Sequence, residues 1–292
     1  MKLRCCGTGS DGNCYSLISS SGEILLIECG VKRWNDILKM INYRISDVSG
    51  CILTHAHKDH CINAKKALDA GIPIYTNDET VEHINIISGE LLIGLTEMRS
   101  KQIGSFRVIP FYLPHTTPDR ETGWILPCPN YGYIIEHEEM GRMIYASDMQ
   151  VIARANGTGW LCEKNGMPYR WNLAKNVVFD GIPAGSPCWR DMKSMRLNHM
   201  LIECNYLFSK RHEIDPVKRN HVLQGHHSLE LCKGFVNKNK TSSLRTVTLC
   251  HMSQSNGNPE AMQREIQETA GDDVLVQIAR PGLEVDLNLC PF

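Results

Sequence analysis

Apolar residues in the first half of the chain fall in short runs that are bounded by turn-forming residues. Such runs are typical of strands. We predict strands at 15–19, 24–28, 51–54, 106–113, 131–136 and 143–147. Two stretches between them, 34–41 and 64–68, have the spacing of amphipathic helices. Because strands that alternate with helices build layered folds, we predict an α/β architecture.

The second half repeats this alternation after an irregular segment. We predict strands at 199–204, 246–250, 274–278 and 283–287, and helices at 228–237 and 258–269. Between 152 and 195 the pattern gives way to Gly, Pro and Asn with three tryptophans, Trp160, Trp171 and Trp189. So many large aromatic residues argue against a disordered linker. We therefore predict one domain, 1–292, with an ordered insertion at 152–195, whose tryptophans either anchor it or stack on nucleic acid bases.

Composition supports one globular domain. The chain has 292 residues, of which 42% are hydrophobic, and no run of 18 uncharged apolar residues. The residues after Met1 lack the apolar segment of a signal peptide, so we expect a cytoplasmic protein with no membrane partner. The 13 cysteines are scattered and form no CxxC motif. We expect them to be small buried apolar residues in a reducing compartment; the alternative is an accessory metal site.

Charge is distributed unevenly along the chain. The net charge of -1 gives no sign of a nucleic acid partner. Between residues 193 and 245, however, ten basic residues stand against four acidic ones, which gives a local charge of +6. This region is either a surface for an anionic partner or an ordinary solvated surface.

Residues 55–60 read His-Ala-His-Lys-Asp-His and directly follow the predicted strand at 51–54. Imidazoles and a carboxylate are suitable ligands for zinc, manganese or iron. Three further candidates stand at the ends of later predicted strands: His115, Asp148 and His251. Strand ends that cluster at one edge of a sheet form a site, so we predict a metal centre there.

The 55–60 run and the order of the later candidates resemble the ligand set of the metallo-β-lactamase superfamily. The resemblance covers nearly the whole chain and implies a four-layer αββα sandwich with two divalent ions, zinc or manganese. It also implies two ligand groups and one bridging residue: His55, His57 and His115; Asp59, His60 and His251; and Asp148. The superfamily usually has Asp at the end of its early strand, where this chain has Glu28. We expect Glu28 to orient the metal ligands by contacting them without binding the metal itself.

Two segments resemble the WalJ (YycJ)-type exonucleases of bacteria. The opening 7–15, Gly-Thr-Gly-Ser-Asp-Gly-Asn-Cys-Tyr, is similar to their Gly-Ser-rich start. Residues 251–260 are similar to their His-Leu-Ser...Asn-Asn-x-Pro-Glu segment, although Gly257 separates the two asparagines.

A third resemblance concerns Glu203, in Leu-Ile-Glu-Cys-Asn-Tyr, and His226, in Gly-His-His-Ser. The two are similar to the Glu-Ala-Asn and Gly-His-Leu-Ser motifs of that family and to the leaving-group acid pair of ribonuclease Z. They imply that His226, polarised by Glu203, protonates the departing oxygen, while Asp59 orients a hydroxide held by two metal ions. The alternatives are a paired buried carboxylate with a helix-start histidine, or His227 in place of His226.

These resemblances imply a dinuclear metal-dependent phosphodiesterase, and specifically a 5′-to-3′ DNA exonuclease that acts by hydroxide attack. An RNA-processing enzyme or a phosphodiesterase of small or cyclic nucleotides is the first alternative. A glyoxalase-like thioesterase fits less well because it gives Glu203 and His226 no task. The second alternative is an inactive, metal-bound scaffold that binds DNA.

Overall fold

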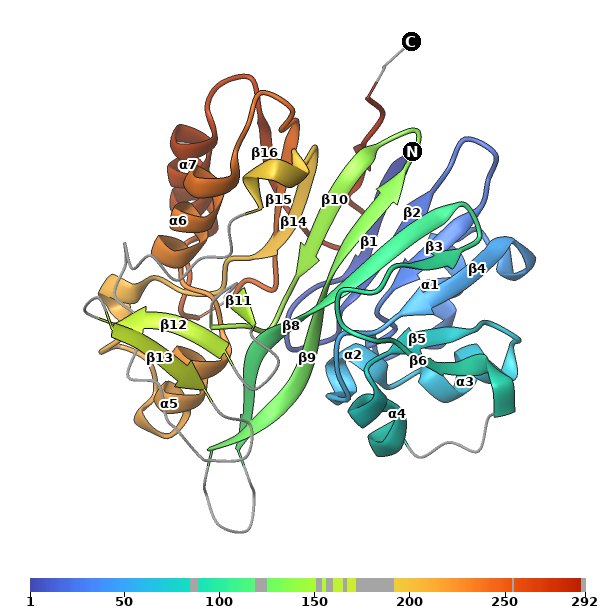
Figure 1. The fold of residues 1–292 in the computed structure, drawn as a ribbon, viewed down its shortest axis with the longest axis horizontal. Coiled ribbons are helices and arrows are strands. Elements are labelled where there is room, and N and C mark those ends of the chain that lie inside the picture. The colour runs from blue at the N-terminus through green and yellow to red at the C-terminus, as the bar shows by residue number, and fades with distance from the viewer. Residues whose placement is uncertain are drawn as a thin grey trace.

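The computed structural model describes residues 1–84, 89–118, 125–150, 154–155, 160–164, 167–171, 192–253 and 255–289. Two seven-stranded sheets pack face to face, and helices cover their outer faces (Figure 1). The layers therefore follow the order αββα, as predicted. No helix in these ranges combines the length and the apolar composition needed to cross a membrane.

The first sheet has the order β17-β1-β2-β3-β4-β5-β6. Its strands are β1 (Lys2–Gly7), β2 (Cys14–Ile18), β3 (Ile24–Ile27), β4 (Val48–Ile52), β5 (Ile74–Thr76), β6 (Leu92–Gly94) and β17 (Glu284–Asp286). The connecting helices are α1 (Trp34–Met40), η1 (Ile45–Asp47), α2 (Lys58–Cys61), α3 (Ala64–Asp69), α4 (Asp78–Ile84) and η2 (Gly89–Leu91). Strands β3 to β6 are parallel, so their carboxyl ends lie at one edge.

The second sheet has the order β16-β15-β14-β10-β9-β8-β7. Its strands are β7 (Lys101–Ile103), β8 (Phe106–Pro118), β9 (Ile125–His137), β10 (Gly141–Ala146), β14 (His199–Glu203), β15 (Thr246–Cys250) and β16 (Leu275–Ile278). Its helices are η4 (Phe208–Lys210), α5 (Pro216–Gly225), α6 (Leu229–Asn239) and α7 (Pro259–Ala270). Strands β10, β14, β15 and β16 are parallel, so this sheet also gathers strand ends at one edge.

Alternation of side chains along the strands divides the core into three apolar layers. In β3, Leu25 and Ile27 face the layer between the two sheets, whereas Ile24 and Leu26 pack under α1 and α3. A third layer packs the second sheet against α6 and α7. Both faces of the central parallel strands are therefore buried, which explains their nearly continuous apolar sequences.

Helices α6 and α7 begin where their sequences provide capping residues. The Ser228 side chain accepts a hydrogen bond from the backbone N–H of Leu231, and the Asn258 side chain accepts one from Ala261. Such caps satisfy backbone donors of the first helical turn. The predicted helices at 228–237 and 258–269 thus match α6 and α7 to within two residues at each end.

Several elements were not predicted from the sequence. Strands β5, β6 and β7 contain three residues each, too few to show a period. Helix α5 reads Pro-Val-Lys-Arg-Asn-His-Val-Leu-Gln-Gly and has no clear apolar face. Strand β1 does alternate, with Leu3 and Cys5 buried between more exposed neighbours, so its pattern was available in the sequence.

The predicted insertion at 152–195 contains a small antiparallel sheet separate from the two main ones. Its strands are β11 (Arg154–Ala155), β12 (Trp160–Lys164) and β13 (Met167–Trp171), with Trp160 opposite Trp171 in the register. The short helix η3 (Lys193–Met195) closes the segment. Trp189 and most of the remainder lie outside the described residues. The roles of the three tryptophans stay predictions.

Candidate metal centre

The predicted ligands converge at the strand ends of both sheets. Residues 55–60 follow β4, Asp148 follows β10, and His251 directly follows β15. His115 lies within β8, near the end of that long strand. The centre is therefore built where the parallel halves of the two sheets meet.

His55, His57 and His115 form the first ligand group. Nε2 of His55 and Nε2 of His115 lie 2.9 and 3.3 Å from Nδ1 of His57. Burial lowers the pKa of His55 and of His115 well below the ordinary histidine value. These imidazoles are therefore neutral and keep the lone pair with which histidine binds a metal ion.

Neighbouring oxygen atoms fix the orientation of two of these rings. Nδ1 of His55 lies 2.8 Å from the Thr54 hydroxyl. Nδ1 of His115 lies 3.1 Å from the Gly225 carbonyl oxygen, which can only accept a hydrogen bond. The proton of His115 is therefore on Nδ1, and its Nε2 lone pair faces the group. Partners of this kind orient metal-binding histidines in proteins.

Asp59, His60 and His251 form the second group. The Asp59 carboxylate lies 3.5 Å from Nε2 of His60 and 3.8 Å from Nε2 of His251. The other ring nitrogens face buried carboxylates, with Glu28 3.2 Å from His60 Nδ1 and Glu203 3.0 Å from His251 Nδ1. Nε2 of His251 is buried and has no hydrogen-bond partner among the described residues. A metal ion would satisfy that nitrogen.

Asp148 lies between the two groups. One carboxylate oxygen is 2.7 Å from His60 Nε2, and the other is 3.3 Å from Nδ1 of His226 and 3.5 Å from Nδ1 of His251. Burial disfavours its ionised form, but His251 and His60 hold the pKa of Asp148 well below its ordinary value. Asp148 also forms a cluster of candidate ligands with His55 and His60. This is the place that the resemblance implies for a bridging ligand.

The charges of the centre suit divalent cations. Four carboxylates share it: Glu28, Asp59, Asp148 and Glu203. Although burial opposes the change, Asp148 and Glu28 raise the pKa of His60 well above its ordinary value. Against the same effect of burial, Asp148, Asp59 and Glu203 raise the pKa of His251 to about 10. The two histidines thus hold protons that metal ions would displace on binding.

Three residues of the centre have left-handed backbone conformations although none is glycine. The φ angles are 62° for Glu28, 51° for Asp148 and 50° for His251, and each residue follows a strand directly or after one residue. Such conformations cost about 1 kcal/mol or more and persist where the surrounding structure enforces them. The fold therefore stores strain at the positions that direct side chains into the centre.

Glu203 is fully buried and joins two histidines. One carboxylate oxygen lies 2.8 Å from Nδ1 of His226 and 3.0 Å from Nδ1 of His251. The other accepts a hydrogen bond from the Met149 backbone at 3.0 Å. The sequence predicted the contact with His226 but not the contact with His251. Glu203 thus links the candidate acid to a candidate metal ligand.

His227 has different surroundings from His226. It is fully buried, and its Nδ1 lies 3.0 Å from the Gln150 carbonyl oxygen. His226 keeps a small exposed fraction, and its ring stacks on His251 with 5.2 Å between centroids. Of the two neighbours, His226 is therefore the one placed beside the ligand groups.

Sequence reasoning missed two residues next to the centre. The His221 ring on α5 lies 5.3 Å from the His226 ring and 6.4 Å from the His115 ring, between centroids. Burial, together with His226, lowers the pKa of His221 to about 4. Cys128 of β9 clusters with the three histidines of the first group. Alignment of β8 with β9, which pairs Cys128 with His115, is the signal that would have found it.

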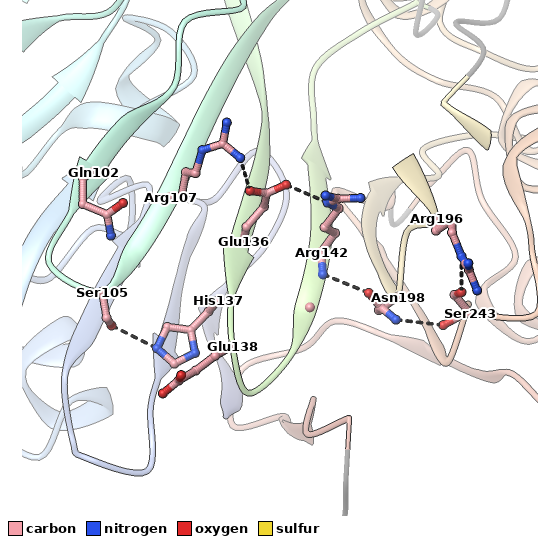
Figure 2. Close-up of a pocket in the computed structure, with 11 residues that line it drawn as sticks. Gln102, Ser105, Arg107, Glu136, His137, Glu138, Arg142, Arg196, Asn198 and Ser243 are labelled. Atoms are coloured by element: carbon pink, nitrogen blue, oxygen red, sulfur yellow. Dashed lines mark hydrogen bonds and ion pairs between the residues drawn. The ribbon is translucent and has the colours of Figure 1, made fainter. Parts of the chain in front are cut away.

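A separate pocket of about 560 Å³ lies at the opposite ends of the same strands. Figure 2 shows its arginines, with Arg107 and Arg142 on either side of Glu136 and Arg196 beside Ser243. Arg142 is the second residue of β10, whereas Asp148 lies just beyond the other end of this strand. The pocket is therefore distinct from the metal centre.

Comparison with known proteins places the chain in a known fold. No protein-family model and no curated protein sequence matches it. The solved structure of the metallo-β-lactamase fold protein YhfI from Bacillus subtilis is 15% identical, with a TM-score of 0.62 and coverage of 97% of this chain and 98% of that one. Zn²⁺-bound PqqB from Methylobacterium extorquens is 11% identical, with a TM-score of 0.62 and coverage of 98% and 100%.

Human tRNase Z, short form, is 14% identical, with a TM-score of 0.56 and coverage of 99% of this chain and 100% of that one. At such low identities the likeness establishes the fold. The chain has the metallo-β-lactamase fold, as its sequence predicted. The narrower resemblance to WalJ-type exonucleases stays a prediction.

We predict two divalent ions per chain, with Asp148→Ala as the most damaging single change of a ligand candidate. The reason is that Asp148 contacts His60 and His251 of the second group and clusters with His55 of the first, so its negative charge lies near both. Elemental analysis after reconstitution with zinc or manganese should give two equivalents for the parent protein. Asp69→Ala, which changes an exposed carboxylate, is the control. One equivalent or fewer in the parent would contradict the prediction.

We predict that Glu28→Ala weakens metal binding by about 10- to 100-fold, as the loss of residues that support metal ligands typically does. The change removes the carboxylate beside His60 Nδ1. Glu28→Asp should preserve fold and activity, because aspartate keeps the charge and accepts the left-handed backbone more readily. Competition with a metal chelator measures both affinities. Unchanged affinity in Glu28→Ala would show that Glu28 has no such role.

Proposed function

We propose that this protein is a metal-dependent hydrolase of phosphodiesters, and that it degrades DNA from 5′ ends. The observation that carries the proposal is the buried Glu203 carboxylate 2.8 Å from His226, directly beside the ligand groups. Cleavage of a phosphodiester needs a proton donor for the departing oxygen. A hydrolase of thioesters or lactams would leave this pair without an evident task.

His226 is placed to donate that proton. Its Nδ1 is engaged by Glu203, so donation to a leaving group falls to Nε2. The carboxylate oxygens of Glu203 and Asp148 lie 2.8 and 3.3 Å from Nδ1 and orient the ring. Divalent ions in the ligand groups would activate water and neutralise the phosphate oxygens.

Asp59 is the carboxylate that we assign to the attacking water. Its side chain is 27% exposed, whereas those of Asp148 and Glu203 are 4% and 0% exposed. Asp59 can therefore contact solvent and the ligand groups together. We propose that it orients the water for attack on phosphorus, opposite the oxygen that His226 protonates.

Part of the basic region at 193–245 adjoins the centre. The Gly225 carbonyl at the end of α5 contacts His115, and Lys210 and Lys218 are exposed before and within this helix. Arg196, in contrast, lines the pocket at the opposite strand ends. Only some of the ten basic residues can therefore contact a substrate at the centre.

RNA is the alternative substrate. The likeness in fold to human tRNase Z favours it, and the Glu203–His226 pair would serve cleavage of either nucleic acid. Assays on matched DNA and RNA substrates decide between them.

We predict that His226→Ala slows turnover by about 10²- to 10⁴-fold, the usual contribution of a general acid, while metal content stays unchanged. His226 is a cleaner test than Glu203, because Glu203 also contacts His251. Single-turnover rates and elemental analysis on the same samples provide the measurement. His227→Ala, which changes the adjacent histidine, is the control. A larger loss of rate in His227→Ala would assign the role to that residue instead.

We predict that linear duplex DNA is shortened from its 5′ ends and releases products with 5′-phosphates. Contacts from lysines and arginines to the backbone would release counterions, so binding should weaken steeply with salt. The assay uses duplexes labelled at one end or the other and incubated with manganese, with a closed circle as control. Loss beginning at the 3′ end would refute the polarity. Equal cleavage of the circle would refute exonuclease action, and preferred hydrolysis of thioesters would refute the proposed class.

A further inference from the structure

The ring of His57 has its two nitrogens in different surroundings. Nδ1 lies 2.9 and 3.3 Å from the Nε2 atoms of His55 and His115, at the centre of the first ligand group. Nε2 points away from these contacts and lies 3.9 Å from the sulfur of Cys128. If Nδ1 provides the lone pair for a metal ion, the neutral ring must carry its proton on Nε2. That proton requires an acceptor.

Cys128 is held in place by the β8–β9 pairing. It stands directly opposite His115 in the antiparallel register, and opposite residues project to the same face of a sheet. Its sulfur also lies 4.0 Å from the Pro129 carbonyl oxygen, to which the thiol can donate. With the S–H directed to that oxygen, the sulfur lone pairs are left for the Nε2–H of His57.

The outer partners of the two ligand groups differ in charge. In the second group, carboxylates face both histidines: Glu28 faces His60 and Glu203 faces His251. In the first group the outer partners are neutral: the Thr54 hydroxyl, the Gly225 carbonyl and the Cys128 thiol. The thiol is the weakest acceptor of this set.

We propose that Cys128 is a positioning residue of the metal centre. Its sulfur accepts the Nε2–H of His57, keeps Nδ1 directed inward, and so raises the affinity of the first ligand group for a divalent ion. The inference depends on the metal-binding part of the proposed function and not on the nature of the substrate.

The test compares Cys128→Ala and Cys128→Ser with the parent protein. A chelator competition with zinc should show about tenfold weaker binding of one ion in Cys128→Ala, the lower end of the range for such partners, and unchanged binding of the other. Cys128→Ser should retain most of the affinity, because a hydroxyl also accepts. Cys232→Ala, which changes another buried cysteine far along the chain, is the control and should bind both ions normally.

Two spectroscopic readouts separate this role from general packing and from direct ligation. In the zinc-loaded protein, nitrogen NMR of the histidines should show His57 protonated at Nε2, with a resonance that shifts in Cys128→Ala and not in Cys232→Ala. The cobalt-loaded parent should lack a thiolate-to-cobalt charge-transfer band. Such a band, lost in Cys128→Ser, would make Cys128 a ligand and overturn the positioning role.

The remaining outcomes test the inference and the proposed function separately. Equal zinc affinity in the parent and Cys128→Ala would overturn the inference alone. Failure of the parent to bind zinc or cobalt would overturn both the inference and the proposed function. Normal metal binding with the expected loss in Cys128→Ala, but without cleavage of nucleic acid, would support the inference and overturn the proposed substrate class.

Discussion

The buried carboxylate of Asp148 contacts three histidines of the candidate centre. Its carboxylate lies 2.7 Å from His60 and within 3.5 Å of both His226 and His251. Negative charge in a buried place is costly unless cations or protons oppose it. The surrounding histidines provide that compensation, and metal ions can replace it. Although burial opposes the change, the Asp148 carboxylate therefore raises the pKa of both His60 and His251.

The layered core makes this arrangement possible. Parallel strands of both sheets end at the same edge, and their apolar side chains fill the space between the sheets. The titratable residues of the candidate centre are buried where the strands stop, and there they contact each other. The left-handed conformations of Glu28, Asp148 and His251 turn the chain out of the sheets at these points. The favourable packing of the strands offsets the free-energy cost of these strained conformations.

The two ligand groups are alike in position but differ in their surroundings. Carboxylates face both histidines of the Asp59 group, whereas neutral groups face the histidines of the His57 group. A carboxylate partner raises the basicity of a metal-binding imidazole. The two ligand groups are therefore chemically unequal, and Glu203 connects the Asp59 group to the candidate proton donor His226.

Sequence alone predicted the elements whose patterns are long or chemically specific. The apolar runs predicted the central strands, and the alternation of strand and helix patterns in the second half predicted α6 and α7. Residues 55–60 indicated a candidate metal site because they place three histidines and an aspartate within six positions. Short elements such as β5 and the polar helix α5 left no periodic signal. The contact of Glu203 with His251, the place of His221 and the contact of Cys128 with His57 required the tertiary structure. The Glu203–His251 contact depends on the pairing of β14 with β15, and the Cys128–His57 contact depends on the packing of the second sheet against the first, so neither could be deduced from the local sequence.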